Sequence, residues 1–175
     1  NSLNDGTYSD CTIKVTNAEG YVSNSITITS FVVDSAAATL EEVTAVTTPT
    51  NDPTPNYTFS SDQAGTITYG GSCSSVNTSA ISGNTTITLV SLSDGTYSDC
   101  TVTVTDTASN SVTLNMSSFT VDTTAPSVSS FILSDTLLKT GDNATVTLVF
   151  SEVVVGFSSD ADIEHPNGTL PAMIS

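Results

Sequence analysis

The segment SDGTYSDCTVTVT at residues 93–105 opens with an Asp-Gly turn signal and runs into alternating Thr and Val. Strict alternation of β-branched and polar residues after such a turn is typical of a half-buried β-strand. The segment NDGTYSDCTIKVT at residues 4–16 repeats it closely. The chain is therefore predicted to contain two copies of one strand unit.

The spacing of the two copies predicts the size of the repeating domain. Cys11 and Cys100 are equivalent and lie 89 residues apart, whereas Asp34 and Asp122, which end the matching SFVVD and SFTVD segments, lie 88 apart. Solenoid repeats have periods of about 20–50 residues, and a small β-sandwich has about 100. The sequence thus predicts sandwich domains in tandem.

The phase of the repeat predicts the domain boundaries. Residues 1–34 match only the second half of the complete unit at residues 35–122, so we expect 1–34 to be the C-terminal part of a truncated repeat. The TTAP segment that follows has the composition of a linker. Residues 123–175 are then expected to be this linker and the N-terminal part of a further domain.

Composition favours strands throughout the chain. Ser and Thr make up about a third of the residues, and no window shows a sustained helical stripe of apolar residues. The predicted fold class is all-β, with seven short strands in the complete unit and no significant helix. The expected strands are residues 40–47, 56–60, 65–69, 79–81, 85–90, 95–105 and 111–121.

Two strands change the face on which their apolar residues lie. Cys100 and Val102 have even numbers, but Tyr97 is odd, and a similar shift separates Met116 from Phe119. The second shift recurs in the first copy. A one-residue slip moves side chains to the opposite face of a sheet, so bulges are expected at both places.

Charge excludes several functions. The chain carries 18 Asp and Glu against 2 Lys, for a formal net charge of -16, whereas nucleic acids and anionic membrane surfaces bind clusters of basic residues. A hydrophobic content of 37% still favours a folded chain. No apolar run approaches the about 20 residues of a membrane span, and Asn1 opens no signal peptide, so an interior piece of a secreted protein is expected.

Several motifs resemble tandem bacterial Ig-like domains of large secreted or surface adhesin proteins. The LSDGTY segment at 92–97 and the FTVDTTAP segment at 119–126 carry the resemblance in the complete unit. In the last part, the segments SDTLLKTGDNATVT at 134–147 and FSE at 150–152 are similar to another bacterial Ig-like type. The resemblance implies Ig-like β-sandwiches, with Tyr97 as the tyrosine corner.

The resemblance also implies a disulfide. In an Ig-type sheet, Cys73 would lie just past strand C and Cys100 near the start of the neighbouring strand F. A Cys73–Cys100 bridge is therefore expected, with two buried reduced thiols as the alternative. The bridge implies an oxidising compartment. Cys11 is the copy of Cys100, and its partner is expected before residue 1.

The chain lacks the residues for common catalytic relays. His165 is the single imidazole and there is no Arg, so no repeat unit can assemble a Ser-His-Asp or Cys-His site. We do not expect an enzyme or a bound organic cofactor.

Calcium is the ligand that the composition favours, because it binds carboxylate and carbonyl oxygens on loops. Ig-type topology groups turn acids at each domain junction; solvated acids that keep the protein soluble are the alternative. The predicted sets are Asp5, Asp34, Asp62 and Asp106 at the first junction, and Asp52, Asp94, Asp122 and Glu152 at the second.

Two functions remain open at this point. The first is a non-catalytic extracellular module, a stalk segment of a large bacterial surface or secreted repeat protein whose partners are neighbouring repeats and a host or surface ligand. The second is a spacer or carbohydrate-contacting module of a secreted hydrolase. Low aromatic content, at 6%, weighs against a surface that stacks sugars.

Overall fold

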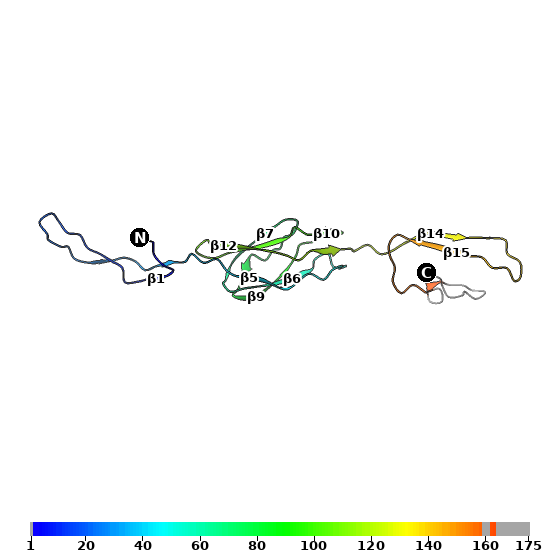
Figure 1. Cartoon of the computed structure of the whole chain (residues 1–175), viewed down its shortest axis with the longest axis horizontal. Helices are drawn as coiled ribbons and strands as arrows, with labels where there is room; N and C mark the ends of the chain where they lie inside the picture. The colour runs from blue at the N-terminus through cyan, green and yellow to red at the C-terminus, as the bar shows by residue number, and fades with distance from the viewer. Residues whose placement is uncertain (1, 159–161, 164–175) are drawn as a thin grey trace. The chain divides into compact units, whose positions relative to one another are not determined.

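A computed structural model of the chain describes residues 2–158, 162 and 163 (Figure 1). Contacts divide the chain into two compact units, Asn1–Thr123 and Thr124–Ser175. All the elements with assigned bounds in the described residues are β-strands, which confirms the all-β class. The finer division at residues 34/35 and 122/123 stays a prediction. His165 lies outside the described residues.

One sheet of the complete sandwich has the strand order β5-β6-β9. These are β5 (Leu40–Thr44), β6 (Asn56–Ser61) and β9 (Gly83–Thr88), and all pair antiparallel. Their inward residues include Tyr57 and Phe59, which are almost completely buried. Alternation along β6 produces this face, as the period of a strand requires.

The second sheet has the order β12-β11-β7-β8. Its strands are β12 (Ser111–Asn115), β11 (Thr101–Thr105), β7 (Gly65–Gly70) and β8 (Ser79–Ala80). The TVTVT sequence of β11 alternates half-buried Thr with fully buried Val, so the expected period-2 pattern is confirmed.

Strands β10 (Gly95–Tyr97) and β13 (Phe119–Val121) form a separate two-stranded ladder. They continue the hairpin of β11 and β12 in register, because Tyr97 pairs with Phe119 and Thr101 pairs with Asn115. The predicted bulges at these places are therefore wrong: the paired strands break together into two ladders. The face of the hairpin changes at the break, which explains the shift in parity. Counting each broken strand once, the sandwich has seven strands.

Strand β13 has a second neighbour on its other side. Thr50 forms a parallel bridge with Val121, and the Thr50 amide donates to the Thr120 carbonyl oxygen at 2.9 Å. The first strand of the sandwich thus contributes to both layers, β5 to one sheet and Thr50 to the ladder of β13.

The core lies between the two layers. Burial of each large apolar side chain there stabilises the fold by about 1.5–3 kcal/mol. The buried cluster consists of Val46, Tyr57, Phe59, Ile67, Cys73, Ala80, Ile87, Leu89, Leu92, Cys100, Val102, Val104, Met116, Phe119 and Val121.

Threonines cover the outer faces of the sheets. Thr103 and Thr113 lie opposite each other with their hydroxyl oxygens 2.7 Å apart, and Thr58 and Thr86 form the same kind of pair at 2.8 Å. Cross-strand hydroxyl pairs stabilise a sheet modestly and suit β-branched residues. The high Thr content is therefore explained by sheet surfaces.

Residues 6–33 form a hairpin that repeats the one at 95–121. Its strands are β1 (Gly6–Tyr8), β2 (Thr12–Ile13), β3 (Ile26–Thr27) and β4 (Phe31–Val33). Both ladders keep the register of the second copy, and Ile28 donates to the Cys11 carbonyl oxygen as Met116 does to Cys100. The apolar face is uncovered, since Ile13 is 56% exposed and its equivalent Val102 is 0% exposed.

The second unit contains a hairpin of β14 (Val128–Leu133) and β15 (Val146–Phe150). The pairing slips by one residue near Ser130. Phe150 packs edge-on against Phe157, with ring centres 5.1 Å apart. Most side chains of β14 are exposed in this hairpin.

Candidate functional site

The tyrosine corner occurs in both copies of the repeat. The Tyr97 hydroxyl donates to the Ser93 carbonyl oxygen at 2.8 Å, and the Tyr97 ring stacks on Phe119 with centres 5.4 Å apart. Tyr8 makes the equivalent hydrogen bond to Asn4 at 2.8 Å. The hydrogen bond to nearby backbone that the tyrosine corner implies for Tyr97 is therefore confirmed.

A disulfide joins Cys73 to Cys100, with Cα atoms 5.2 Å apart. The expected bridge is present, and Cys11 is a free, half-buried thiol. Cys100 lies in the break between β10 and β11, so the bridge holds this interruption to the segment that follows β7. An added Cβ at Gly71 would lie 2.0 Å from the Asp99 carbonyl oxygen, so only glycine fits beside the bridge.

Asp99 adds a hydrogen bond between the two segments that the disulfide joins. Its carboxylate accepts a hydrogen bond of 2.9 Å from the Ser72 hydroxyl. Hydrogen bonds from Ser72 lower the pKa of Asp99 below its ordinary value, because they favour the ionised form. Asp99 therefore stays charged at neutral pH while it holds the turn next to the disulfide.

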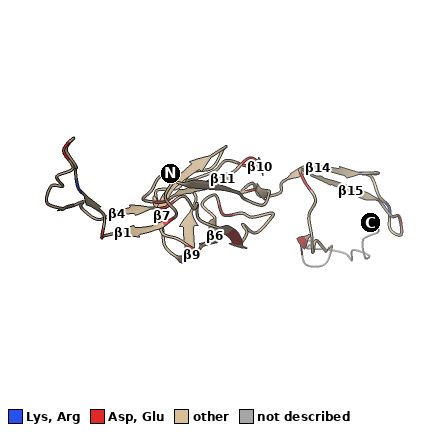
Figure 2. Cartoon of the chain, turned by 60° about the vertical axis from the view of Figure 1, so that its left-hand side comes forward, with Lys and Arg blue, Asp and Glu red and all other residues tan. Residues whose placement is uncertain are grey.

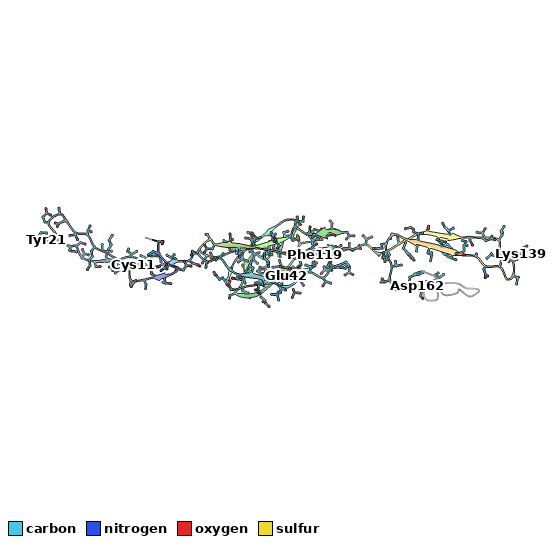
Figure 3. The ribbon with its side chains drawn as sticks, in the orientation of Figure 1. Cys11, Tyr21, Glu42, Phe119, Lys139 and Asp162 are labelled. Atoms are coloured by element: carbon cyan, nitrogen blue, oxygen red, sulfur yellow. A yellow bond between two sulfur atoms is a disulfide. The ribbon has the colours of Figure 1, made fainter. Side chains whose placement is uncertain are left out.

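Glu42 holds the other side of the hairpin break. Its carboxylate accepts hydrogen bonds from the Ser117 amide at 2.9 Å and the Ser117 hydroxyl at 2.7 Å. Partial burial acts to raise the pKa of Glu42, but the bonds from Ser117 outweigh it and the pKa is lowered. Ser117 lies between β12 and β13, so Glu42 supplies an acceptor where the ladder is interrupted. Figure 3 shows Glu42 and Phe119 among the side chains of the sandwich.

Tyr57 is buried close to Glu42. Burial, followed by the negative charge of Glu42, raises the pKa of the Tyr57 hydroxyl well above its ordinary value. The hydroxyl makes no hydrogen bond of ordinary geometry to any described residue, although it interacts with the Glu42 carboxylate. Tyr57 therefore stays neutral and contributes mainly a buried ring.

Two acids of the first predicted calcium set hold the linker. Asp5 Oδ1 accepts from the Ser35 hydroxyl at 2.8 Å and from the Ser35 amide at 3.1 Å. Asp34 Oδ1 accepts from the Ala36 amide at 3.1 Å, in a turn two residues long. Both carboxylates lie where the hairpin ends and the next sandwich begins.

The other two acids of this set hold loops of the complete sandwich. Asp62 Oδ1 accepts from the Thr39 amide at 2.7 Å. Asp106 accepts from the Asn110 amide and side chain at 2.9 and 3.0 Å. Hydrogen bonds from Asn110 lower the pKa of Asp106, which keeps it ionised at neutral pH.

The second predicted set divides between the two units of the chain. Asp94 Oδ1 accepts from the Thr123 hydroxyl at 2.8 Å and amide at 2.9 Å, and Asp52 accepts from the Thr54 amide at 2.8 Å. Asp122 follows β13 directly. In the second unit, one carboxylate oxygen of Glu152 is buried with no hydrogen-bond donor among the described residues.

Acidic side chains lie mainly in turns and between strands in the described parts of the chain (Figure 2). Glu41 and Glu42 on β5 are the exception. Most of the charge therefore lies in the connections between strands.

Two family models match the sequence. Residues 41–123 match a model described as a bacterial Ig-like domain, and residues 122–175 match a second model of the same description. Residues 41–175 belong to tandem bacterial Ig-like domains. The first match spans the disulfide-bonded sandwich, and the second begins at Asp122 and covers the β14–β15 hairpin. No curated protein and no solved structure matched the chain.

The Ig-like domains do not gather the first set of predicted calcium ligands. Among the residues that the structure describes, no three His, Cys, Asp or Glu side chains are grouped to hold a metal ion. The acids instead accept hydrogen bonds from nearby main-chain amides, as turn and cap residues do. Calcium binding stays a prediction.

Sequence reasoning missed the contact between Glu42 and Ser117, which lie 75 residues apart in the chain. It also missed that Asp5 and Asp94 contact the linker in the same way. A signal for the second existed, because the Asp and its Ser or Thr partner recur with the period of the Ig-like repeat.

Bacterial Ig-like domains are typically non-catalytic structural modules and are commonly extracellular, and the disulfide agrees with an oxidising compartment. Within the described residues, no helix has the length and apolar character needed to cross a membrane.

Proposed function

We propose that this chain is a stalk segment of a large bacterial surface or secreted protein, in which tandem Ig-like domains hold a binding domain away from the cell. The observation that carries the proposal is the repeat of the hairpin at 6–33 in the hairpin at 95–121. The two copies share strand register, tyrosine corner and linker contact. Folded units repeated along one chain make it longer, as a stalk requires.

The stalk proposal is further supported by the linker, since short connections limit bending between domains. Val33 ends one hairpin and Leu40 begins the next sandwich. The disulfide stabilises the sandwich outside the reducing cytosol, where a surface protein has to stay folded. Neighbouring Ig-like domains of the same chain are the partners in this role, and an adhesive ligand would bind elsewhere.

The experiment is immunogold electron microscopy of intact cells of the source bacterium, with antibodies against residues 35–122 and against a distal part of the same protein. We expect label on the outer surface, and a greater distance from the envelope for the distal epitope. Label confined to the cytosol would contradict the proposal. Release of the protein with a bound polysaccharide-degrading activity would favour the accessory module of a hydrolase instead.

A further inference from the structure

The Asp of each Asp-Gly turn holds the second residue after the last strand of its hairpin. In the first copy, Asp5 Oδ1 accepts from both the amide and the hydroxyl of Ser35, at 3.1 and 2.8 Å. In the second copy, Asp94 Oδ1 accepts from both the amide and the hydroxyl of Thr123, at 2.9 and 2.8 Å. The same oxygen receives both bonds in each case, although Ser has been replaced by Thr.

The backbone explains why the contact recurs. Gly6 pairs with Val33 and Gly95 pairs with Val121, so each Asp lies one residue beyond the end of its ladder. The two glycines have φ values of 153° and 154°, a conformation that glycine adopts freely and that side chains disfavour. The turn thus presents its carboxylate to the chain that leaves the hairpin.

At the first junction, the linker also accepts hydrogen bonds from the sandwich that follows it. At the first junction, the Asn110 side-chain amide donates to the Asp34 carbonyl oxygen at 3.1 Å. The Gln63 side chain donates to the Ala36 carbonyl oxygen at 3.4 Å. Residues 34–36 therefore contact the hairpin before them through Asp5 and the sandwich after them through Asn110 and Gln63.

We propose that Asp5 and Asp94 are positioning residues that fix the linker at the exit of each Ig-like domain and so restrict bending between neighbouring domains. The bonds are made directly between the carboxylate and Ser35 or Thr123, and need no metal ion. The restriction of bending rests on the proposed stalk function, whereas the hydrogen bonds of Asp5 and Asp94 do not depend on it.

Asparagine and alanine distinguish this contact from a calcium site. Asp94→Asn keeps a carbonyl oxygen at the Oδ1 position and loses the charge, while Asp94→Ala loses both. A neutral acceptor still binds an amide and a hydroxyl. Calcium sites depend strongly on ligand charge, so both substitutions would weaken such a site.

The test is amide hydrogen exchange by NMR on the full 175-residue chain. We expect exchange at Thr123 to become at least ten times faster in Asp94→Ala and to stay nearly unchanged in Asp94→Asn. Asp5→Ala and Asp5→Asn should act in the same way on Ser35. Asp10→Ala is the matched control, because the Asp10 carboxylate has no hydrogen bond to a described residue, and it should leave both amides unchanged. Protection of Val102 and Val104 reports that the sandwich stays folded.

Each other outcome overturns the proposal. Unchanged protection at Thr123 in Asp94→Ala would show that the contact does not hold the linker. Equal loss in the Asn and Ala variants, or protection that appears only with calcium chloride and disappears with EDTA, would show a charge-dependent metal site. Faster exchange without greater motion of residues 128–150 in ¹⁵N relaxation would overturn the effect on bending. Surface labelling tests the stalk function separately.

Discussion

The Met116 amide donates to the Cys100 carbonyl oxygen at 3.0 Å, between the two ladders of the broken hairpin. This bond keeps the register of β10–β13 and β11–β12 the same, although the ladders are separate. The disulfide of Cys100 and the Glu42–Ser117 contact lie at the same level. Both strands of the hairpin are thus bonded to other parts of the sandwich at the break.

Removal of the disulfide should destabilise the complete sandwich. Closing a loop of 27 residues stabilises by about 3.5 kcal/mol in the chain-entropy model. Cys73→Ser with Cys100→Ser should therefore lower the Tm measured by circular dichroism, whereas Cys11→Ser should not. Mass analysis of peptides under non-reducing conditions should link Cys73 to Cys100. Two free thiols there in protein purified under oxidising conditions would contradict the bridge.

Glu42 should make stability depend on pH. Its folded-state pKa is lowered, so its stabilising contribution is complete above the ordinary carboxyl pKa and is lost as pH falls through the lowered value. Glu42→Gln should cost about 1 kcal/mol at neutral pH, because hydrogen bonds to a charged group are replaced. The cost should shrink in urea unfolding at acidic pH. Glu41→Gln, on the exposed side of the same strand, is the control, and an equal effect there would exclude a specific role for Glu42.

Replacing Ser109 with glycine should stabilise the folded sandwich. It has a φ of 74°, whereas the equivalent residue in the first copy is Gly20, with a φ of 90°. A non-glycine residue in the left-handed region costs about 1–2 kcal/mol, partly offset by the backbone entropy of glycine. Ser109→Gly should therefore stabilise by up to about 1 kcal/mol in thermal unfolding. Ala108→Gly should not stabilise, and a gain of the same size there would point to a general effect of loop flexibility.

Calcium binding at the first junction can be measured directly. If Asp34 and Asp106 are ligands, titration calorimetry of the chain with calcium chloride should give a binding heat, and the Tm should rise with calcium concentration. A ligand at 100 times its Kd stabilises by about 2.7 kcal/mol. Asp34→Asn with Asp106→Asn should abolish the response. No change up to millimolar calcium would show that these acids serve only as hydrogen-bond acceptors.

The sequence predicts the strands and the core well because both follow from period-2 alternation. Val102 and Val104 are buried as expected, and the expected strand at 95–105 does contain β10 and β11. Parity shows that the buried face changes near Ser98. It does not show whether a bulge or a break between ladders causes the change, because both move side chains by one position.

Contacts between distant loops are harder to predict. Glu41 and Glu42 are adjacent and chemically alike, and only the pairing of β5 determines that Glu42 reaches Ser117. The calcium prediction grouped acids by the pole of the sandwich on which their loops lie. Within a pole, short turns direct each carboxylate to its own neighbouring amide, as for Asp34 and Ala36, and topology alone does not contain this detail.

The parallel bridge between Thr50 and Val121 has a consequence for assembly during synthesis. Residues 35–122 begin immediately after a hairpin that closely resembles their own, so closure on the wrong hairpin is the expected misassembly of such repeats. In that misassembly Thr50 would lie beside Val33, the equivalent of Val121. Leu40 would then lie about 33 Å from Val33, because an extended strand from Leu40 to Thr50 has that length. The seven steps from Val33 to Leu40 reach at most about 25 Å. The short linker therefore opposes pairing of residues 40–50 with the preceding hairpin, and in this sandwich Thr50 instead pairs with the hairpin that follows it in the sequence.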